Sequence, residues 1–123
     1  MKGLVKGIAK KARENTYFRQ VLETGANTQI VIMSIPPGGE IGMEVHDKED
    51  QVLYFVEGAG EVILEGETQP IEEGDIVLVH KGTKHNFKNT GLEDLKIITT
   101  YSPPHHPAGT AHKTKEEADK AEY

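Results

Sequence analysis

Four side chains of the kinds that bind metal ions stand near glycine-containing turns of this sequence: Glu44, His46, Gln51 and His85. Glu44 and His46 are two positions apart, and such residues of an extended segment point to the same face. The turn DKED follows His46, so an antiparallel hairpin would return the Gln51 amide to that face. His85 follows the turn KGTK and opens a later strand. One sheet is therefore predicted to gather two imidazoles, a carboxylate and an amide.

Two neutral imidazoles and one carboxylate form the ligand set of non-haem Fe(II) sites, which keep open coordination positions. Gln51 adds a neutral oxygen that either binds the ion or holds a metal-bound water. Mixed nitrogen and oxygen donors suit several divalent transition metals, so the choice stays open among Fe, Mn, Zn, Ni, Co and Cu. Because an imidazole must be neutral to bind a metal, we expect the metal to leave on acidification through about pH 6.

Other polar residues near these four have simpler interpretations. His80 precedes the turn KGT and is interpreted as a turn residue. The acidic residues after His46 are Asp47, Glu49 and Asp50. They lack the glycine and the final glutamate of a calcium-binding loop, and are interpreted as a solvated turn. The histidines near the C-terminus are His105, His106 and His112. These could transfer protons or bind a second metal, but the surrounding prolines favour a strap along the surface.

Short segments rich in β-branched residues must position these groups. They are residues 30–33, 52–56, 62–64, 76–79 and 96–101. Glycine recurs between them every eight or nine residues, from Gly58 to Gly91, which indicates repeated strand and turn. We therefore predict an all-β sandwich or barrel of antiparallel strands. Several strands are apolar at consecutive positions, so either the opposing sheet or another subunit should cover both faces, and a homodimer is expected.

The two ends of the chain differ from this pattern. Val5, Gly7 and Ile8 are compatible with a leading strand. The segment SPPHHPAG is too rich in proline for a central strand and should run extended over the surface. Thr114 and Glu117 then form a capping box, which predicts a short C-terminal helix over KEEADKAE.

Composition narrows the class of protein. A chain of 123 residues matches one compact domain. The formal net charge of -6 disfavours nucleic acid as a partner. The chain has no cysteine, so it can form neither a disulfide nor a thiolate zinc site, which suits a reducing compartment. The N-terminus lacks the apolar run of a secretory signal, and no segment is apolar enough to span a membrane, so a cytoplasmic protein is expected.

The spacing around the four metal-binding side chains resembles the two motifs of the cupin superfamily. Residues 39–58 read G-x4-E-x-H-x4-Q-x6-G, and residues 74–89 read G-x5-H-x-G-x2-H-x3-N. The resemblance implies a double-stranded β-helix, or jelly-roll, with one cupin domain over residues 1–123 and a strap with a short helix over 102–122. It also implies a metal on the inner face and a small-molecule ligand in the barrel. The C-terminal segment looks similar to small cupins often labelled mannose-6-phosphate isomerase-like.

Three positions depart from the usual cupin pattern. Glu44 replaces the first histidine of motif 1, Gln51 replaces its glutamate, and His80 replaces the proline of motif 2. The first two changes compensate in charge, because three neutral histidines with one glutamate carry the same -1 as Glu44 with two neutral histidines and a glutamine. A bound cation would therefore experience a similar total charge.

Two classes of function remain open. The first is an enzyme that acts on a small oxygen-rich substrate, hydroxycarbonyl or sugar-like, by isomerisation or by O₂-dependent oxidation. The second is a non-catalytic module that binds or senses a metal or a small ligand. Of the two arginines, Arg13 and Arg19, neither lies in a motif, which weakens the case for a phosphosugar isomerase. An empty barrel is disfavoured, because burying Glu44 without a cation would cost several kcal/mol.

Overall fold

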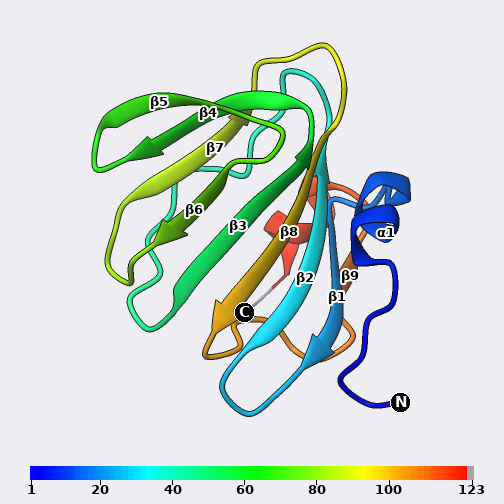
Figure 1. The fold of residues 1–123 in the computed structure, drawn as a ribbon. Coiled ribbons are helices and arrows are strands. Elements are labelled where there is room, and N and C mark those ends of the chain that lie inside the picture. Colours follow the sequence, from blue (N-terminus) through cyan, green and yellow to red (C-terminus); the bar gives the residue numbers. More distant parts are fainter. Residues whose placement is uncertain (122–123) are drawn as a thin grey trace.

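Two antiparallel sheets dominate the structure, a computed structural model that describes residues 1–121 (Figure 1). Within these residues, the helices and strands follow one another as α1 (Ile8–Glu14), β1 (Arg19–Thr24), β2 (Gln29–Ile35), β3 (Asp50–Glu57), β4 (Ala59–Leu64), β5 (Glu67–Glu72), β6 (Ile76–Val79), β7 (His85–Asn89), β8 (Leu95–Ser102), β9 (Ala111–His112) and α2 (Lys115–Lys120). The larger sheet has the order β6-β3-β8-β2-β1-β9, and the smaller has the order β5-β4-β7. This arrangement confirms the predicted all-β jelly-roll with a short C-terminal helix.

All five predicted segments lie within strands, namely β2, β3, β4, β6 and β8. Three strands were missed: β1, β5 and β9. Most of β5 is exposed, with Pro70 in its middle, and β9 has only two residues, so neither carries an apolar pattern. In β1, Arg19 occupies an inward position that the pattern of a half-buried strand reserves for an apolar residue.

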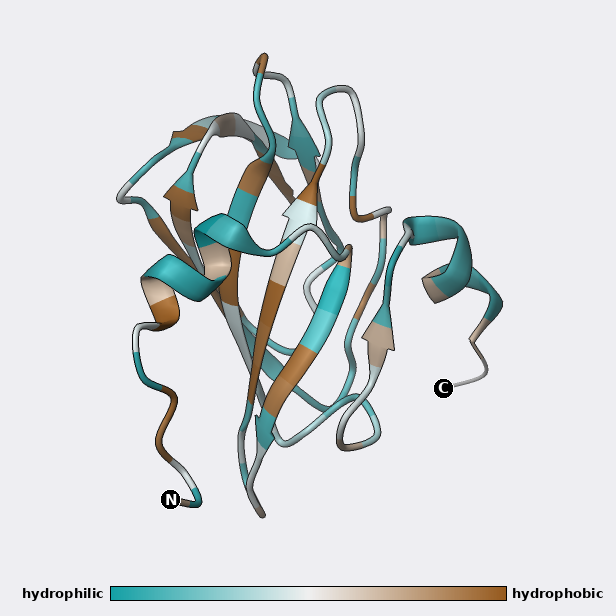
Figure 2. Ribbon diagram, turned by 90° about the vertical axis from the view of Figure 1, so that its right-hand side faces the viewer, coloured by the Kyte–Doolittle hydropathy of each residue, from teal (hydrophilic) through white to brown (hydrophobic). Residues whose placement is uncertain are grey.

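The core lies between the two sheets. Along β3, the buried residues Gln51, Leu53 and Phe55 alternate with residues that are partly or fully exposed, as expected when one face of a strand points inward. Phe55 and Phe87 are fully buried and contact each other from opposite sheets, with ring centroids 5.8 Å apart. Figure 2 shows the hydrophobic stretches running along the strands, whereas both helices are mostly hydrophilic.

Helix α1 corrects the prediction of a leading strand around Ile8. Ala12 is fully buried and packs with Ile32 of β2 and Val56 of β3 on the outer face of the larger sheet. Part of the consecutive apolar pattern in these strands is therefore covered by α1 of the same chain. The helix is mostly polar, and only the side that contacts the sheet is apolar, so a short sequence window did not reveal it.

The segment between β2 and β3 runs antiparallel beside β7. Ile41 N donates to Phe87 O at 2.9 Å, and Asn89 N donates to Gly39 O at the same distance. The predicted hairpin between the Glu44–His46 segment and β3 is therefore wrong, because β3 pairs with β6 and β8. Instead, the segment lies beside the second motif because it pairs with β7.

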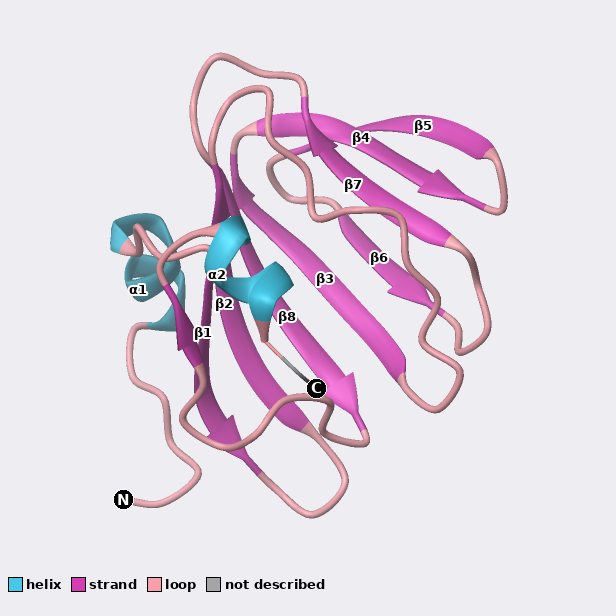
Figure 3. Cartoon of the chain, turned by 180° about the vertical axis from the view of Figure 1, so that it is seen from behind, coloured by secondary structure: helices cyan, strands magenta, loops and turns pink. Residues whose placement is uncertain are grey.

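After β8 the chain leads through β9 to α2. Seen from behind in Figure 3, α2 lies in front of β2 and β8 of the larger sheet. Ala118 of α2 packs against the main core cluster, so the helix is docked. Thr114 caps it by accepting a hydrogen bond from Glu117 N at 3.1 Å, as the capping box predicts. The predicted strap and helix extend to residue 122, which lies outside the described residues. Within residues 1–121, no helix is long and apolar enough to cross a membrane.

Candidate metal centre

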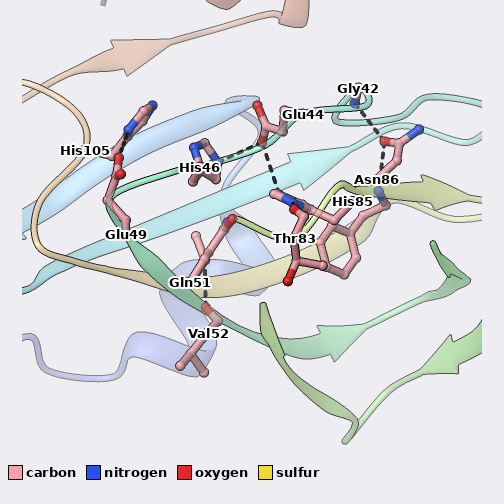
Figure 4. A network of polar contacts seen from close by, with 12 residues as sticks. Gly42, Glu44, His46, Glu49, Gln51, Val52, Thr83, His85, Asn86 and His105 are labelled. Carbon is pink, nitrogen blue, oxygen red and sulfur yellow. Dashed lines mark hydrogen bonds and ion pairs between the residues drawn. The ribbon is translucent and has the colours of Figure 1, made fainter. Parts of the chain in front are cut away.

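Glu44, His46 and His85 converge on one point inside the barrel, as Figure 4 shows. Glu44 Oε1 lies 3.1 Å from His46 Nε2 and 3.7 Å from His85 Nε2. Both imidazoles are buried, and Glu44 is partly exposed. The predicted convergence of two imidazoles and a carboxylate is therefore present in the geometry.

Backbone pairing between the two motifs places Glu44 opposite His85. Each residue's N–H donates to the other's carbonyl at 2.9 Å, in an isolated antiparallel bridge. Asn86 holds the preceding loop by accepting from Gly42 N at 2.8 Å. The motif 1 segment forms no regular strand here. Its backbone hydrogen bonds to β7 nevertheless fix the direction of the Glu44 side chain.

The ring of His85 is oriented for binding through Nε2. Its Nδ1 lies 2.8 Å from the carbonyl oxygen of Thr83, and a carbonyl can only accept, so Nδ1 carries the proton. In the neutral ring, Nε2 then presents a lone pair. That atom is buried and has no hydrogen-bond partner. Many metal-binding histidines are oriented in this way by a backbone carbonyl.

Gln51 is held in a fixed orientation by Thr99. The Thr99 hydroxyl donates to Val52 O at 2.7 Å, and it therefore accepts from the Gln51 amide nitrogen at 3.1 Å. This leaves the Gln51 Oε1 atom buried without a partner. Figure 4 shows the Gln51 side chain on the same side of the sheet as His46 and His85. A buried acceptor with no donor is costly unless something outside the chain satisfies it.

These donors fit a divalent ion. Metal bonds to imidazole nitrogen and carboxylate oxygen measure about 2.0–2.2 Å, so two ligands at right-angled or tetrahedral positions lie about 3.0–3.5 Å apart. The separations of 3.1 and 3.7 Å from Glu44 to the two imidazoles are close to that range. The two unsatisfied atoms, His85 Nε2 and Gln51 Oε1, are a lone-pair nitrogen and a neutral oxygen, both suitable for a transition metal.

The charges of the cluster support one another. Burial alone raises the pKa of Glu44, but the hydrogen bond with His46 and the proximity of His85 outweigh burial and hold the pKa well below its usual range. Burial lowers the pKa of His85. The Glu44 carboxylate and the Thr83 carbonyl raise this pKa by more than burial lowers it, so the pKa of His85 lies above its usual value. Glu44 is therefore ionised at neutral pH, as a ligand must be.

A second group, His46, Glu49 and His105, adjoins the first. The sequence left open a second metal at the C-terminal histidines, but it did not predict Glu49 as a member. Glu49 forms a hydrogen bond with His105 Nδ1, and the His105 ring lies 4.6 Å from the His46 ring between centroids. The interpretation of Glu49 as part of a solvated turn is wrong, because it is only 7% exposed, whereas Asp47 and Asp50 are exposed. The proline-rich strap supplies the partner that Glu49 needs, and nothing in the local sequence of the turn signals that contact.

A pocket of about 110 Å³ opens onto Glu44 and His46. Its other polar lining residues are Arg19, Tyr101, His105, His106 and Asp119. Arg19 was not predicted as a site residue because it lies far from both motifs in the sequence. Only the pairing of β1 with β2 and β9 brings it to the barrel.

The remaining histidines have different environments. His80 is exposed, and its carbonyl accepts from Thr83 N at 3.1 Å, which confirms a turn residue. His106 is buried against Tyr101, with ring centroids 5.0 Å apart, so the strap does not lie wholly on the surface. His112 lies 3.5 Å from the guanidinium of Arg19, measured from Nδ1 to NH1.

The comparisons with known proteins agree with this fold. A cupin domain family model matches residues 31–101. YrkC, an uncharacterized protein of Bacillus subtilis, is 36% identical over 128 residues, which cover 98% of this chain and 68% of YrkC. The crystal structure of BH2720 from Bacillus halodurans has a TM-score of 0.95 and 36% identity, covering 98% of this chain and 96% of that one.

The name of a more distant relative refers to a ligand. The oxalate-binding protein of Thermotoga maritima is 33% identical over 66 residues, which cover 54% of this chain and 54% of that protein. The narrower resemblance to mannose-6-phosphate isomerase-like cupins stays a prediction. Since the family model spans more than half of the chain and includes the polar cluster, this chain belongs to the cupin family.

Proposed function

We propose that this chain is a divalent-metal-binding cupin, with Glu44, His46, His85 and Gln51 as the ligands. The proposal rests mainly on two buried atoms that have no hydrogen-bond partner, His85 Nε2 and Gln51 Oε1, on the same side of the barrel as the Glu44 carboxylate. A structural core would pair such atoms or replace them with apolar groups. A cation satisfies both, and it also offsets the negative charge of Glu44.

The proposed ligand of this centre is a small oxygen-rich molecule. Three of the four metal-binding residues are buried, and the pocket reaches the cluster at Glu44 and His46, so a ligand would approach from that side. A bound ion would supply Lewis acidity to a hydroxyl or carbonyl oxygen, or an O₂-binding position if it is iron or copper. Glu44, His46 and His85 would hold it, and the wall of the pocket would orient the ligand.

The size of the pocket favours small substrates over sugar phosphates. Its 110 Å³ equals about three or four water molecules at roughly 30 Å³ each. A metal-dependent reaction on a short hydroxycarbonyl or carboxylate compound, by isomerisation or O₂-dependent oxidation, suits that volume best. The name of the Thermotoga maritima relative, an oxalate-binding protein, points to the same size class.

One experiment separates the enzyme from the binding module. Protein stripped of metal would be reloaded with Fe(II), Mn(II), Co(II), Ni(II), Cu(II) or Zn(II) and incubated with short hydroxycarbonyl compounds, while oxygen uptake and product formation are followed. Turnover that depends on the metal and is lost in His85→Ala supports the enzyme. A stability gain on metal addition without turnover supports the alternative, a non-catalytic binding cupin. No metal uptake at all contradicts the proposal.

Two further parts of the proposal concern assembly and compartment. A homodimer is proposed, because Ile76 and Leu78 on edge strand β6 are exposed apolar residues. A cytoplasmic location is proposed from the absence of cysteine in the sequence, which suits a reducing compartment.

A further inference from the structure

Arg19 places a buried positive charge in the wall of the metal-site pocket. It opens β1, where its neighbours in register are Met33 of β2 and His112 of β9. The residue is only 8% exposed, and it lines the same pocket as Glu44 and His46. An arginine is rarely buried to this degree unless an anion accompanies it.

Within residues 1–121, no carboxylate forms an ion pair with Arg19. Its guanidinium lies 3.5 Å from His112 Nδ1, through NH1, and its Cζ lies 5.2 Å from the centroid of the Phe18 ring. The Nε atom is buried and has no hydrogen-bond partner. Burial raises the pKa of the neighbouring Tyr101 to about 12, so its hydroxyl is neutral and supplies no countercharge. Among the described residues, no carboxylate therefore contacts the Arg19 guanidinium directly, and its Nε–H is left without an acceptor.

The charge balance of the pocket indicates what would compensate it. Glu44 and Arg19 line the pocket, and Glu49 lies behind its wall, against the lining residue His105. With neutral histidines, the two carboxylates and the guanidinium sum to -1. A divalent ion at the proposed centre changes that sum to +1. Asp119 also lines the pocket, but Lys115 pairs with it at 2.7 Å. The metal-loaded pocket therefore suits a ligand with a single negative charge.

Size and chemistry then narrow the ligand class. A volume of about 110 Å³ suits a molecule of a few non-hydrogen atoms better than a hexose or its phosphate. A guanidinium presents parallel N–H donors that match the two oxygens of a carboxylate. A metal with open positions binds a hydroxyl or carbonyl oxygen.

We propose that Arg19 binds the carboxylate of a short 2-hydroxy or 2-oxo monocarboxylate, whose oxygen on the neighbouring carbon is directed to the ion held by Glu44, His46 and His85. The inference rests on the proposed function and names its substrate class. Arg19 is then the residue that selects an acid over a neutral hydroxycarbonyl compound of equal size.

The test uses glycolate and its neutral isostere glycolamide, each of which has five non-hydrogen atoms. Both are titrated calorimetrically into metal-loaded wild-type protein, Arg19→Gln and Arg19→Lys, and the metal content of every sample is measured separately. We expect Arg19→Gln to weaken glycolate binding about 10- to 100-fold, the value of a charged hydrogen-bonded pair. Arg19→Lys should weaken it less, because it keeps the charge and loses the planar fork. Glycolamide affinity should be the same in all three proteins.

The opposite results are distinguishable. If wild-type protein contains metal and either ignores glycolate or binds it as tightly as Arg19→Gln does, the inference is overturned and the metal centre stands. An equal loss of glycolate and glycolamide affinity would mean that the substitution disturbed the pocket as a whole, which also overturns it. Absence of metal from the wild-type protein would contradict the proposed function, and with it this inference. Arg19→Lys retains the buried cation, so it remains informative if Arg19→Gln folds poorly.

Discussion

Glu44 and His85 face each other across an isolated antiparallel bridge, with a reciprocal pair of backbone hydrogen bonds of 2.9 Å. The bridge joins the two cupin motifs directly and sets the Glu44 carboxylate 3.7 Å from the His85 ring. The carboxylate that replaces a histidine in motif 1 therefore still points at the histidine of motif 2. This relationship makes the altered ligand set geometrically consistent.

Replacing Gln51 with leucine should have opposite effects on stability and on metal binding. The metal-free protein should be as stable as wild type or more stable, because the substitution removes a buried oxygen that has no partner. Metal affinity should fall about 10- to 100-fold, since even groups that only orient a ligand are worth that much. Urea denaturation and metal titration measure the two quantities.

Gln51→Glu is the matched control for that substitution. It keeps an oxygen at the same place and adds a negative charge, so metal affinity should equal or exceed that of wild type. Unchanged metal affinity in Gln51→Leu would show that Gln51 is not a ligand.

Replacing Glu49 should destabilise the protein more than replacing Asp47, which belongs to the same turn. Glu49 is 7% exposed and forms a hydrogen bond with His105, whereas Asp47 is exposed. We expect Glu49→Ala to lower the free energy of unfolding by about 1–3 kcal/mol, since it leaves a half-buried imidazole without its partner. Asp47→Ala should change it by less than about 0.5 kcal/mol. Equal stability of the two variants in urea would show that the strap is not held by this contact.

The sequence predicted which side chains converge because each of them lies at a fixed distance from a turn. Glu44, His46 and Gln51 follow Gly39, and His85 follows Gly82, so spacing alone located them. The supposed hairpin was wrong in its pairing partner, yet the residues still converged, because the pairing with β7 leads to the same inner face.

Arg19 and Glu49 were missed for a physical reason. Their roles depend on contacts between segments that are far apart in the chain, β1 with β9 for Arg19 and the strap with the turn for Glu49. The local sequence pattern indicates which face of a strand is apolar. Arg19 and Glu49 are polar residues at buried positions, so this pattern does not identify them. A buried charge of this kind becomes visible only when the partner segment is placed beside it.

His106 should make the protein less stable as the pH falls below neutrality. Burial lowers the pKa of His106 to about 3, and the charge of Arg19 acts in the same direction. The other charged or titratable groups that act on it are His105, His112 and Glu44. An unfolded chain has an imidazole pKa of about 6.5, so the unfolded state binds the proton more tightly than the folded state does. The contribution is complete above about pH 6.5 and is lost at up to about 1.4 kcal/mol per pH unit between pH 6.5 and 3.

The measurement is urea denaturation of metal-free protein at several pH values from 7.5 down to 4.5. His106→Gln should have a shallower loss of stability with falling pH than wild type. His80→Gln, at an exposed histidine, should keep the wild-type slope. Parallel curves for wild type and His106→Gln would contradict the assignment.

The proposed homodimer is tested on the outer face of β6 and β3. Tyr54 pairs in register with Ile76, and these side chains are 39% and 66% exposed. Leu78, two positions from Ile76 on the same face, is 47% exposed. Light scattering should give twice the chain mass for wild type and the single mass for Ile76→Lys with Leu78→Lys. Leu92→Lys changes an exposed leucine in the β7–β8 turn and should remain dimeric; a monomeric wild type would exclude the dimer.

Anomalous diffraction from crystals grown with Co(II) or Mn(II) tests the metal centre most directly. We expect one strong peak about 2.0–2.2 Å from a Glu44 carboxylate oxygen, His46 Nε2 and His85 Nε2. A peak among His46, Glu49 and His105 instead, or no peak in a protein that is otherwise well ordered, would contradict it.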